Sequence, residues 1–143
     1  MNDSHHEPIG DGRDTEAAEM IAAAELRAAL RSFMRESERV AHRAGLTPQR
    51  YLLLLAIQGA ADGSERSTIM ELTDRLQLAQ STVTELVQRA EETGLVEREP
   101  MNARTRTVEI RLTVEGRRRL RDAFRELATE RHRLSETIRA LGL

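Results

Sequence analysis

The 143-residue sequence contains no cysteine and no lysine, and it has only three aromatic side chains. The absence of cysteine excludes disulfide bonds, thiolate nucleophiles, thiol redox sensing and every zinc site that includes a cysteine. No apolar run approaches the ~20 residues that a membrane-spanning helix needs. The first 20 residues are acidic, which is unlike a signal peptide. We therefore expect a soluble cytoplasmic protein with no membrane partner.

The length and composition fit one folded domain. Apolar residues make up 39% of the chain, enough for a core, and the 32% of charged residues carry both signs, which argues against global disorder. All 22 basic residues are arginine, whose planar guanidinium group offers five hydrogen-bond donors. Residues 1–14 are polar and lack periodicity, so we predict a mobile acidic tail there and a single domain over 15–143.

Charge is distributed unevenly along the chain. Residues 1–25 hold seven acidic residues against one arginine, a net charge of −6, while the remainder carries +4. Within that remainder, residues 98–121 hold eight arginines and three glutamates, a net charge of +5. The total charge of −2 therefore conceals an acidic beginning and a basic late segment. The run Arg117–Arg119 in that segment is either a solvated helix face or a set of phosphate contacts.

Residues 15–92 predict four helices. Residues 15–43 lack glycine and proline and place apolar side chains on one helical stripe, and Gly45 follows as a C-terminal cap. The pair Thr47-Pro48 is typical of a helix start, and the apolar segment after it indicates a buried helix. Residues 59–67 are predicted to be a loop. Two short helices over 68–76 and 80–92 follow, with their apolar residues at helical spacing.

The turn between the two short helices contains Gln77. If this turn requires a left-handed backbone, a residue with a side chain strains it by about 1 kcal/mol. Beyond it the apolar pattern changes to a period of two, which predicts strands over 95–99 and 107–112. Thr113 is then expected to cap one long helix from Val114 to about Ala140. The fold class is therefore mainly α with a small β-hairpin.

The second short helix has a polar outward face. In a helix-turn-helix the second helix enters the DNA major groove, where such side chains hydrogen-bond bases and phosphates. The alternative is an amphipathic helix whose polar face is merely solvated. The candidate DNA-binding residues of this helix are Gln80, Ser81, Thr82, Thr84, Glu85, Gln88 and Arg89.

The hairpin that follows carries Arg104 and Arg106 near its tip, where a wing would project beyond the helices. A narrow minor groove concentrates negative potential and attracts inserted arginine side chains. The alternative is a charged turn that keeps an edge hairpin soluble. A helix-turn-helix followed by a basic hairpin, in this order and at this spacing, is much rarer by chance than either feature alone.

These features together resemble the MarR (multiple antibiotic resistance regulator) family of winged helix-turn-helix transcription factors, from about Thr15 to Leu141. The resemblance is carried by Gly45–Tyr51, by Ser81–Thr84 through Gly94–Arg98, and by Leu112–Gly116. It implies a winged helix-turn-helix with long N- and C-terminal dimerisation helices over about 15–45 and 113–141. The DNA-binding lobe would then span about 46–112.

The resemblance also implies a function. Members of this family are homodimers whose two lobes bind a pseudo-palindromic operator in double-stranded DNA. They commonly lose DNA affinity when a small effector, often aromatic or anionic, binds between the dimer helices and the lobe. We therefore expect a ligand-responsive repressor and not an enzyme. Phe33, Met34, Tyr51 and Leu55 are candidate pocket residues, although residues at helical spacing more often belong to the core.

The wing departs from the family pattern. Family wings often carry an acidic residue shortly before the arginine that enters the groove, and here that acid is missing. Counting back from Leu112-Thr113 makes Arg106 the groove arginine and Arg104 the second. This departure leaves open an alternative function, a protein-interaction module on the same fold that has lost specific DNA binding and uses its acidic N-terminal segment as the partner surface.

Catalytic and cofactor sites are not indicated. The four histidines are scattered (His5, His6, His42 and His132), and without cysteine they make a poor zinc site, so surface or structural roles are expected. There is no glycine-rich phosphate loop, and the carboxylates are patterned along the surface beside arginines without a distinct catalytic pair. We expect no metal and no cofactor.

Overall fold

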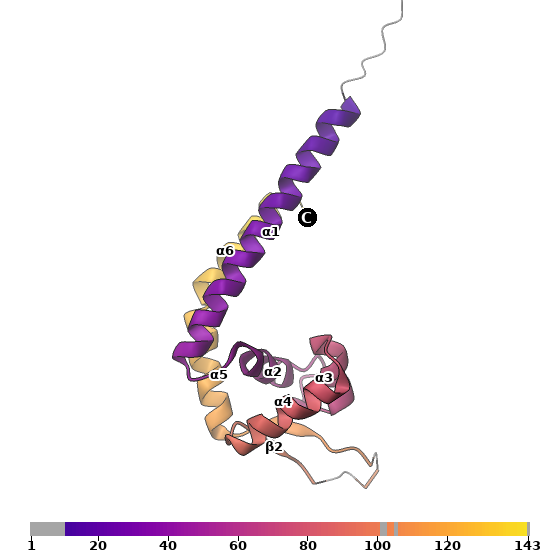
Figure 1. Ribbon diagram of the computed structural model, residues 1–143, viewed down its shortest axis with the longest axis vertical. Coiled ribbons are helices and arrows are strands. Elements are labelled where there is room, and N and C mark those ends of the chain that lie inside the picture. The colour runs from indigo at the N-terminus through magenta and orange to yellow at the C-terminus, as the bar shows by residue number, and fades with distance from the viewer. Residues whose placement is uncertain (1–10, 101–102, 105, 143) are drawn as a thin grey trace, which may run out of the picture. The chain divides into compact units, whose positions relative to one another are not determined.

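A computed structural model describes residues 11–100, 103–104 and 106–142 (Figure 1). Most of the predicted mobile tail lies outside these residues, and the first helix begins at Asp11, before the predicted Thr15. The prediction of a mainly helical fold with a small antiparallel sheet is confirmed. The elements are α1 (Asp11–Arg43), α2 (Pro48–Gln58), β1 (Arg66–Ser67), α3 (Ile69–Leu76), α4 (Gln80–Glu92), β2 (Val96–Arg98), β3 (Ile110–Leu112), α5 (Val114–Glu126) and α6 (Ala128–Ala140).

The described residues form two compact units. One contains α1 as far as Arg35 and the chain from Thr129 onward, and there α1 and α6 lie alongside each other with Phe33 and Leu134 in a hollow between them. The other, which we call the lobe, spans 36–128. The end of α1 and one face of α5 contribute side chains to its core.

The N-terminal half of the lobe is delimited by the predicted caps. At the end of α1, Gly45 adopts a φ of 75°, and the Leu46 amide donates to the Ala41 carbonyl at 2.9 Å, a left-handed helix termination. The Thr47 side chain then accepts a hydrogen bond from the Arg50 amide at 3.2 Å, with Pro48 as the first residue of α2. Both predictions made from these residues are confirmed.

The helix-turn-helix follows the predicted boundaries closely. Thr68 caps α3 by accepting from the Glu71 amide at 3.2 Å and donating to the Glu71 carboxylate at 3.1 Å. The turn into α4 does require a left-handed residue, since Gln77 has φ 54° and ψ 43°. Its side-chain amide donates to the Asp74 carbonyl at 2.6 Å, which offsets part of the backbone strain.

The core of the lobe lies around α2, which contacts α3, α4, α5 and β3. Leu53, Leu54 and Ile57 of this helix are completely buried. They pack with Val83 and Val87 from the inner face of α4 and with side chains of the other elements. Burial of one face of α4 against α2 fixes which of its residues point outward.

The sheet has three strands rather than the predicted two, in the order β1-β3-β2. The interpretation of 59–67 as a loop was therefore wrong at its end, where Arg66 and Ser67 pair with Arg111 and Ile110 of β3. A two-residue strand is too short to show the alternation that identifies strands in a sequence. The strands assigned to the hairpin are also shorter than predicted, although the Glu99 amide still donates to the Glu109 carbonyl at 2.8 Å.

The predicted single C-terminal helix is divided in two at Leu127, whose φ and ψ are −86° and 1°. The Leu127 amide still donates to the Ala123 carbonyl at 3.1 Å, and its side chain is fully buried in the lobe. The helical hydrogen bond thus continues through Leu127. The apolar stripe of the sequence also continues through this residue, so the sequence pattern does not indicate the break.

Candidate nucleic-acid interface

The outward face of α4 is polar along its length. Val83, Val87 and Ala90 point into the core, and the residues at the complementary helical positions are exposed. Five of the seven predicted residues line a shallow hollow on this face, namely Gln80, Ser81, Thr84, Glu85 and Gln88. Their hydroxyl and amide groups both donate and accept hydrogen bonds, the capacity that contact with base edges requires.

The other two predicted residues of α4 lie differently. Thr82 is half-buried at the flank of the helix. Arg89 is exposed, and its guanidinium group lies 2.6 Å from the Glu85 carboxylate in an i, i+4 ion pair. At the start of the helix, Ala79 occupies the N-cap and has no side-chain acceptor, so the first-turn amides of α4 are left to bind an anion such as a phosphate.

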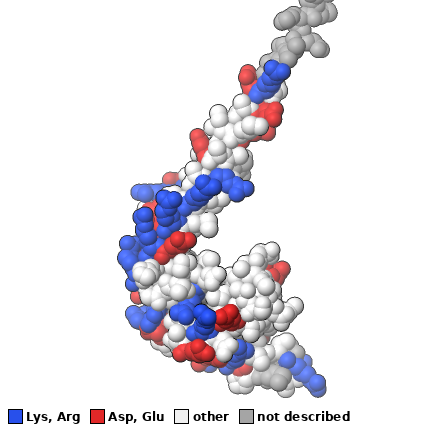
Figure 2. All heavy atoms as spheres, in the orientation of Figure 1, with Lys and Arg blue, Asp and Glu red and all other residues white. Residues whose placement is uncertain are grey.

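The wing loop connects β2 to β3. Arg104 and Arg106 are both exposed on it, and Arg106 has a left-handed backbone with a φ of 52°. The loop residues Met101, Asn102 and Thr105 lie outside the described residues. In Figure 2, blue atoms mark the free end of this loop at the lower right of the lobe.

Most arginines of the basic segment 98–121 already have partners in the lobe. Arg98 pairs with Glu91, and Arg111 pairs with Glu97 and Glu99. Figure 2 shows blue and red atoms side by side at the lower left of the lobe. The net charge of +5 therefore does not translate into a continuous basic surface.

The run Arg117–Arg119 is anchored within the lobe. Arg117 donates to the Leu112 carbonyl at 3.1 Å and Arg119 to the Gly45 carbonyl at 3.2 Å. Arg118 and Arg119 also pair with the Glu115 carboxylate at 2.6 and 2.8 Å. These contacts favour a structural role for the run over phosphate binding.

These hydrogen bonds from Arg118 and then Arg119 hold the pKa of the Glu115 carboxyl at about 2, below its usual value of 4.5. A carboxyl whose pKa is lower in the folded state stabilises the fold when it is ionised in both states. Its contribution is therefore present above pH 4.5 and is lost as the pH falls toward 2. The effect is small because the pair is solvent-exposed.

We expect Glu115→Gln to remove this pH dependence. The melting temperature of the wild type should exceed that of the variant at about pH 6, and the difference should shrink as the pH approaches about 2. Thermal unfolding followed by circular dichroism across that range measures it. Parallel melting curves for the two proteins at every pH would contradict the role assigned to this carboxylate.

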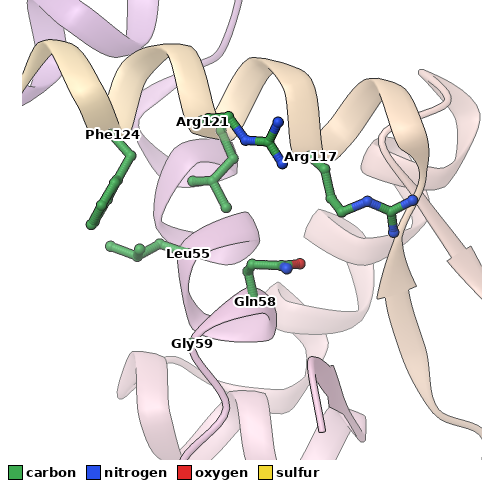
Figure 3. Close-up of a pocket in the computed structure, with 7 residues that line it drawn as sticks. Leu55, Gln58, Gly59, Arg117, Arg121 and Phe124 are labelled. Atoms are coloured by element: carbon green, nitrogen blue, oxygen red, sulfur yellow. The ribbon is translucent and has the colours of Figure 1, made fainter. Parts of the chain in front are cut away.

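A cavity of about 310 Å³ lies between α2 and α5 (Figure 3). Leu55, the one predicted pocket residue found there, lies with Gln58 and Gly59 on the α2 side. The α5 side consists of Arg117, Leu120, Arg121 and Phe124. The sequence prediction missed this second wall, although the four residues share one helical face, a spacing that could have identified them.

The remaining predicted pocket residues are not gathered around this cavity. Tyr51 is only 4% exposed and belongs to the lobe core. Phe33 lines the hollow beside α6, and Met34 is 60% exposed. Since Phe33 and Met34 belong to one compact unit and Tyr51 and Leu55 to the other, a pocket shared by all four stays a prediction.

Within the described ranges, no cluster of three or more histidine and acidic side chains is placed to hold a metal ion. His132 pairs with Glu136 at 3.1 Å on α6, while His5 and His6 lie outside those ranges. None of the described helices combines the length and apolar character needed to cross a bilayer.

Comparison with known proteins shows a similarity to one family. The sequence model of the MarR family matches residues 44–104, which include α2, both helices of the helix-turn-helix, β2 and the first part of the wing loop. Over these residues, which are less than half of the chain, the sequence is similar to the MarR family. This family consists of winged helix-turn-helix transcriptional regulators, which are not enzymes. A search of curated protein sequences gave no match.

Several solved MarR structures share the fold. A MarR family protein from Bacillus stearothermophilus is 23% identical with a TM-score of 0.67, and the match covers 90% of this chain and 81% of that one. An E. coli MarR mutant complexed with operator DNA is 21% identical with a TM-score of 0.62, over 77% and 76% of the two chains. An S. aureus MepR mutant bound to an oligodeoxyribonucleotide is 20% identical with a TM-score of 0.61, over 77% and 78%.

Proposed function

We propose that this chain is a transcriptional repressor that binds a pseudo-palindromic operator in double-stranded DNA as a homodimer and releases it when a small effector binds. The observation that carries the proposal is the polar outward face of α4, fixed by burial of the opposite face and followed by a wing with two exposed arginines. Two of its structural relatives are bound to DNA, one of them to operator DNA. As a DNA-binding regulator, it would act in the cytoplasm.

In this proposal α4 occupies the major groove. Gln80, Thr84 and Gln88 succeed one another every four residues on the outward face, and a glutamine amide can bond the N6 and N7 edge of adenine. The uncapped first turn of α4 would lie against a phosphate. Glu85 remains available to accept from a cytosine amino group if Arg89 turns to a phosphate instead.

The homodimer is supported by apolar surface on α1. Met20 and Ile21 are 62% and 61% exposed, which is unusual for neighbouring large apolar side chains on a lone surface helix. A second copy packed on this helix would bury them. Two-fold symmetry would then present two copies of α4 to half-sites one helical turn or more apart, which is why the operator is expected to be pseudo-palindromic.

The cavity between α2 and α5 supports the effector. Its size is at the lower end of the range for small-molecule sites, which is about 300–1,000 Å³. Leu55 and Phe124 provide an apolar wall at one side, and the side chains of Arg121 and Arg117 project from α5 toward the other side, where Gln58 lies (Figure 3). Apolar walls with adjacent cations suit a small aromatic or anionic molecule.

The test is selection of bound duplexes from a random-sequence library with the full-length protein. We expect enrichment of one inverted-repeat sequence and a gel shift of that duplex that weakens as the salt concentration rises. Placing the enriched sequence in a promoter should lower reporter expression when the protein is present. Absence of any enriched sequence even at low salt would reject the proposal and favour the alternative, a protein-interaction module on this fold.

A further inference from the structure

One carboxylate connects all three strands of the sheet. Glu99 follows the last residue of β2, and its Oε1 atom lies 2.8 Å from the Arg111 guanidinium on β3 and 3.2 Å from that of Arg66 on β1. The Glu99 side chain is only 15% exposed, whereas its neighbour Glu97 is 49% exposed and pairs with Arg111 at 2.8 Å. Glu99 is therefore the inner member of a four-residue ion-pair network.

The network compensates an unfavourable pairing in the sheet. Arg66 and Arg111 are direct cross-strand partners of β1 and β3, so two positive charges face each other. Like charges in such positions destabilise strand pairing. Because one oxygen of Glu99 binds both guanidinium groups, it holds β1 against β3 where the two arginines alone would repel each other.

Glu99 also lies where the wing leaves the sheet. Its amide donates to the Glu109 carbonyl at 2.8 Å, beyond the last paired residues of β2 and β3. The chain between these two residues is the wing loop with Arg104 and Arg106. The side-chain contacts of Glu99 are therefore made at the residue from which the wing loop starts.

We propose that Glu99 is a positioning residue for the wing, whose contacts with Arg66 and Arg111 fix the orientation from which Arg104 and Arg106 reach DNA. This inference rests on the proposed function. It gives Glu99 a role in DNA binding although its negative charge is repelled by the DNA phosphates.

The sign of the effect makes the proposal testable. Removing a carboxylate near DNA raises affinity if only charge matters, whereas loss of wing orientation lowers it. We expect Glu99→Gln to weaken binding to the selected duplex roughly 3- to 10-fold. The matched control is Glu97→Gln, which removes the same charge and a bond to the same arginine, and it should bind equally or more tightly. Equal or tighter binding by Glu99→Gln would overturn the proposal.

A double-mutant cycle distinguishes an effect on DNA binding that acts through the wing from one that results from a general loss of stability. If Glu99 acts through the wing, its substitution should have almost no further effect in an Arg106→Ala background. Additive losses would show that Glu99 affects binding by another route and would reject the proposal. Glu99→Asp, which keeps the charge, should recover part of the lost affinity.

A measurement without DNA distinguishes failure of this inference from failure of the proposed function. The chain has no cysteine, so Ala103→Cys gives a single attachment point on the wing loop for a spin label, and Ala128→Cys gives a control at an exposed position outside the sheet, at the start of α6. Glu99→Gln should increase the motion of the label at 103 and leave the label at 128 unchanged. Unchanged motion at 103 would refute the role of Glu99, whether or not the protein selects a DNA sequence.

Discussion

Gly116→Ala is expected to destabilise the lobe by about 2–4 kcal/mol. This is the largest loss of stability that we expect from adding one methyl group to this structure. A Cβ atom at Gly116 would overlap the carbonyl oxygen of Leu95 and lie 3.0 Å from its carbonyl carbon. Both atoms belong to the backbone. A rotamer change therefore cannot relieve the overlap, and either α5 or the start of β2 has to move.

Neither element can move without breaking other contacts. The Leu95 carbonyl accepts the Thr113 amide at 3.0 Å, and the Thr113 hydroxyl donates to the Gly94 carbonyl at 2.6 Å. The same hydroxyl accepts the Gly116 amide at 3.0 Å and so caps α5. Leu95 itself is 1% exposed in the core, so displacement of this junction also disturbs core packing.

Urea unfolding at constant protein concentration measures the loss. The control is Gly12→Ala on α1, where the added Cβ meets no atom within 4 Å and alanine has the higher helix propensity. That variant should unfold at the same urea concentration as the wild type or slightly higher. If Gly116→Ala unfolds together with it, the close approach of α5 to Leu95 is not a feature of the folded protein.

The parts of the fold that the sequence predicted well have local causes. Thr47, Thr68 and Thr113 each cap the helix that follows through a hydrogen bond to an amide three residues later. Gly45 ends α1 because it tolerates a left-handed backbone. The outward face of α4 was predictable for the same reason, because the spacing of Val83 and Val87 determines which side is buried.

The features that the sequence did not reveal depend on residues distant in the chain. Strand β1 exists only through its pairing with β3, and two residues contain no periodic signal. The sequence contains the acidic residues that pair with the arginines of segment 98–121, but it does not show which acid pairs with which arginine. Glu99, for example, pairs with one arginine 33 positions before it and another 12 positions after it. The net charge of a segment therefore could not indicate which of its arginines are paired with acids in the folded protein.

For the candidate site the same distinction holds. The polar face of α4 and the wing arginines could be proposed from local pattern, since each lies within one element. The helical spacing of the α5 wall was visible in the sequence, but its position opposite the end of α2 was not, because the two walls lie more than fifty residues apart, with Gly59 on one side and Arg117 on the other. Only Leu55 of the four predicted residues lines it.

Arg106→Ala is expected to weaken binding to the selected duplex by about 1–3 kcal/mol without changing the stability of the lobe. The Arg106 side chain is exposed on the wing loop, so its loss costs little in folding. On DNA, an arginine inserted into a narrow minor groove gains from the concentrated negative potential there. The loss should therefore be largest for duplexes whose flanks are A·T-rich and smaller for flanks with a wider groove.

The control for this prediction is Arg98→Ala, which removes one positive charge from the base of the same hairpin. Arg98 lies 3.4 Å from Glu91, so its charge is already partly compensated and its removal should alter affinity much less. Fluorescence anisotropy titrations at several salt concentrations, with duplexes that differ only in their flanks, measure both variants. An unchanged affinity in Arg106→Ala would remove Arg106 from the interface and leave Arg104 as the wing contact to test next.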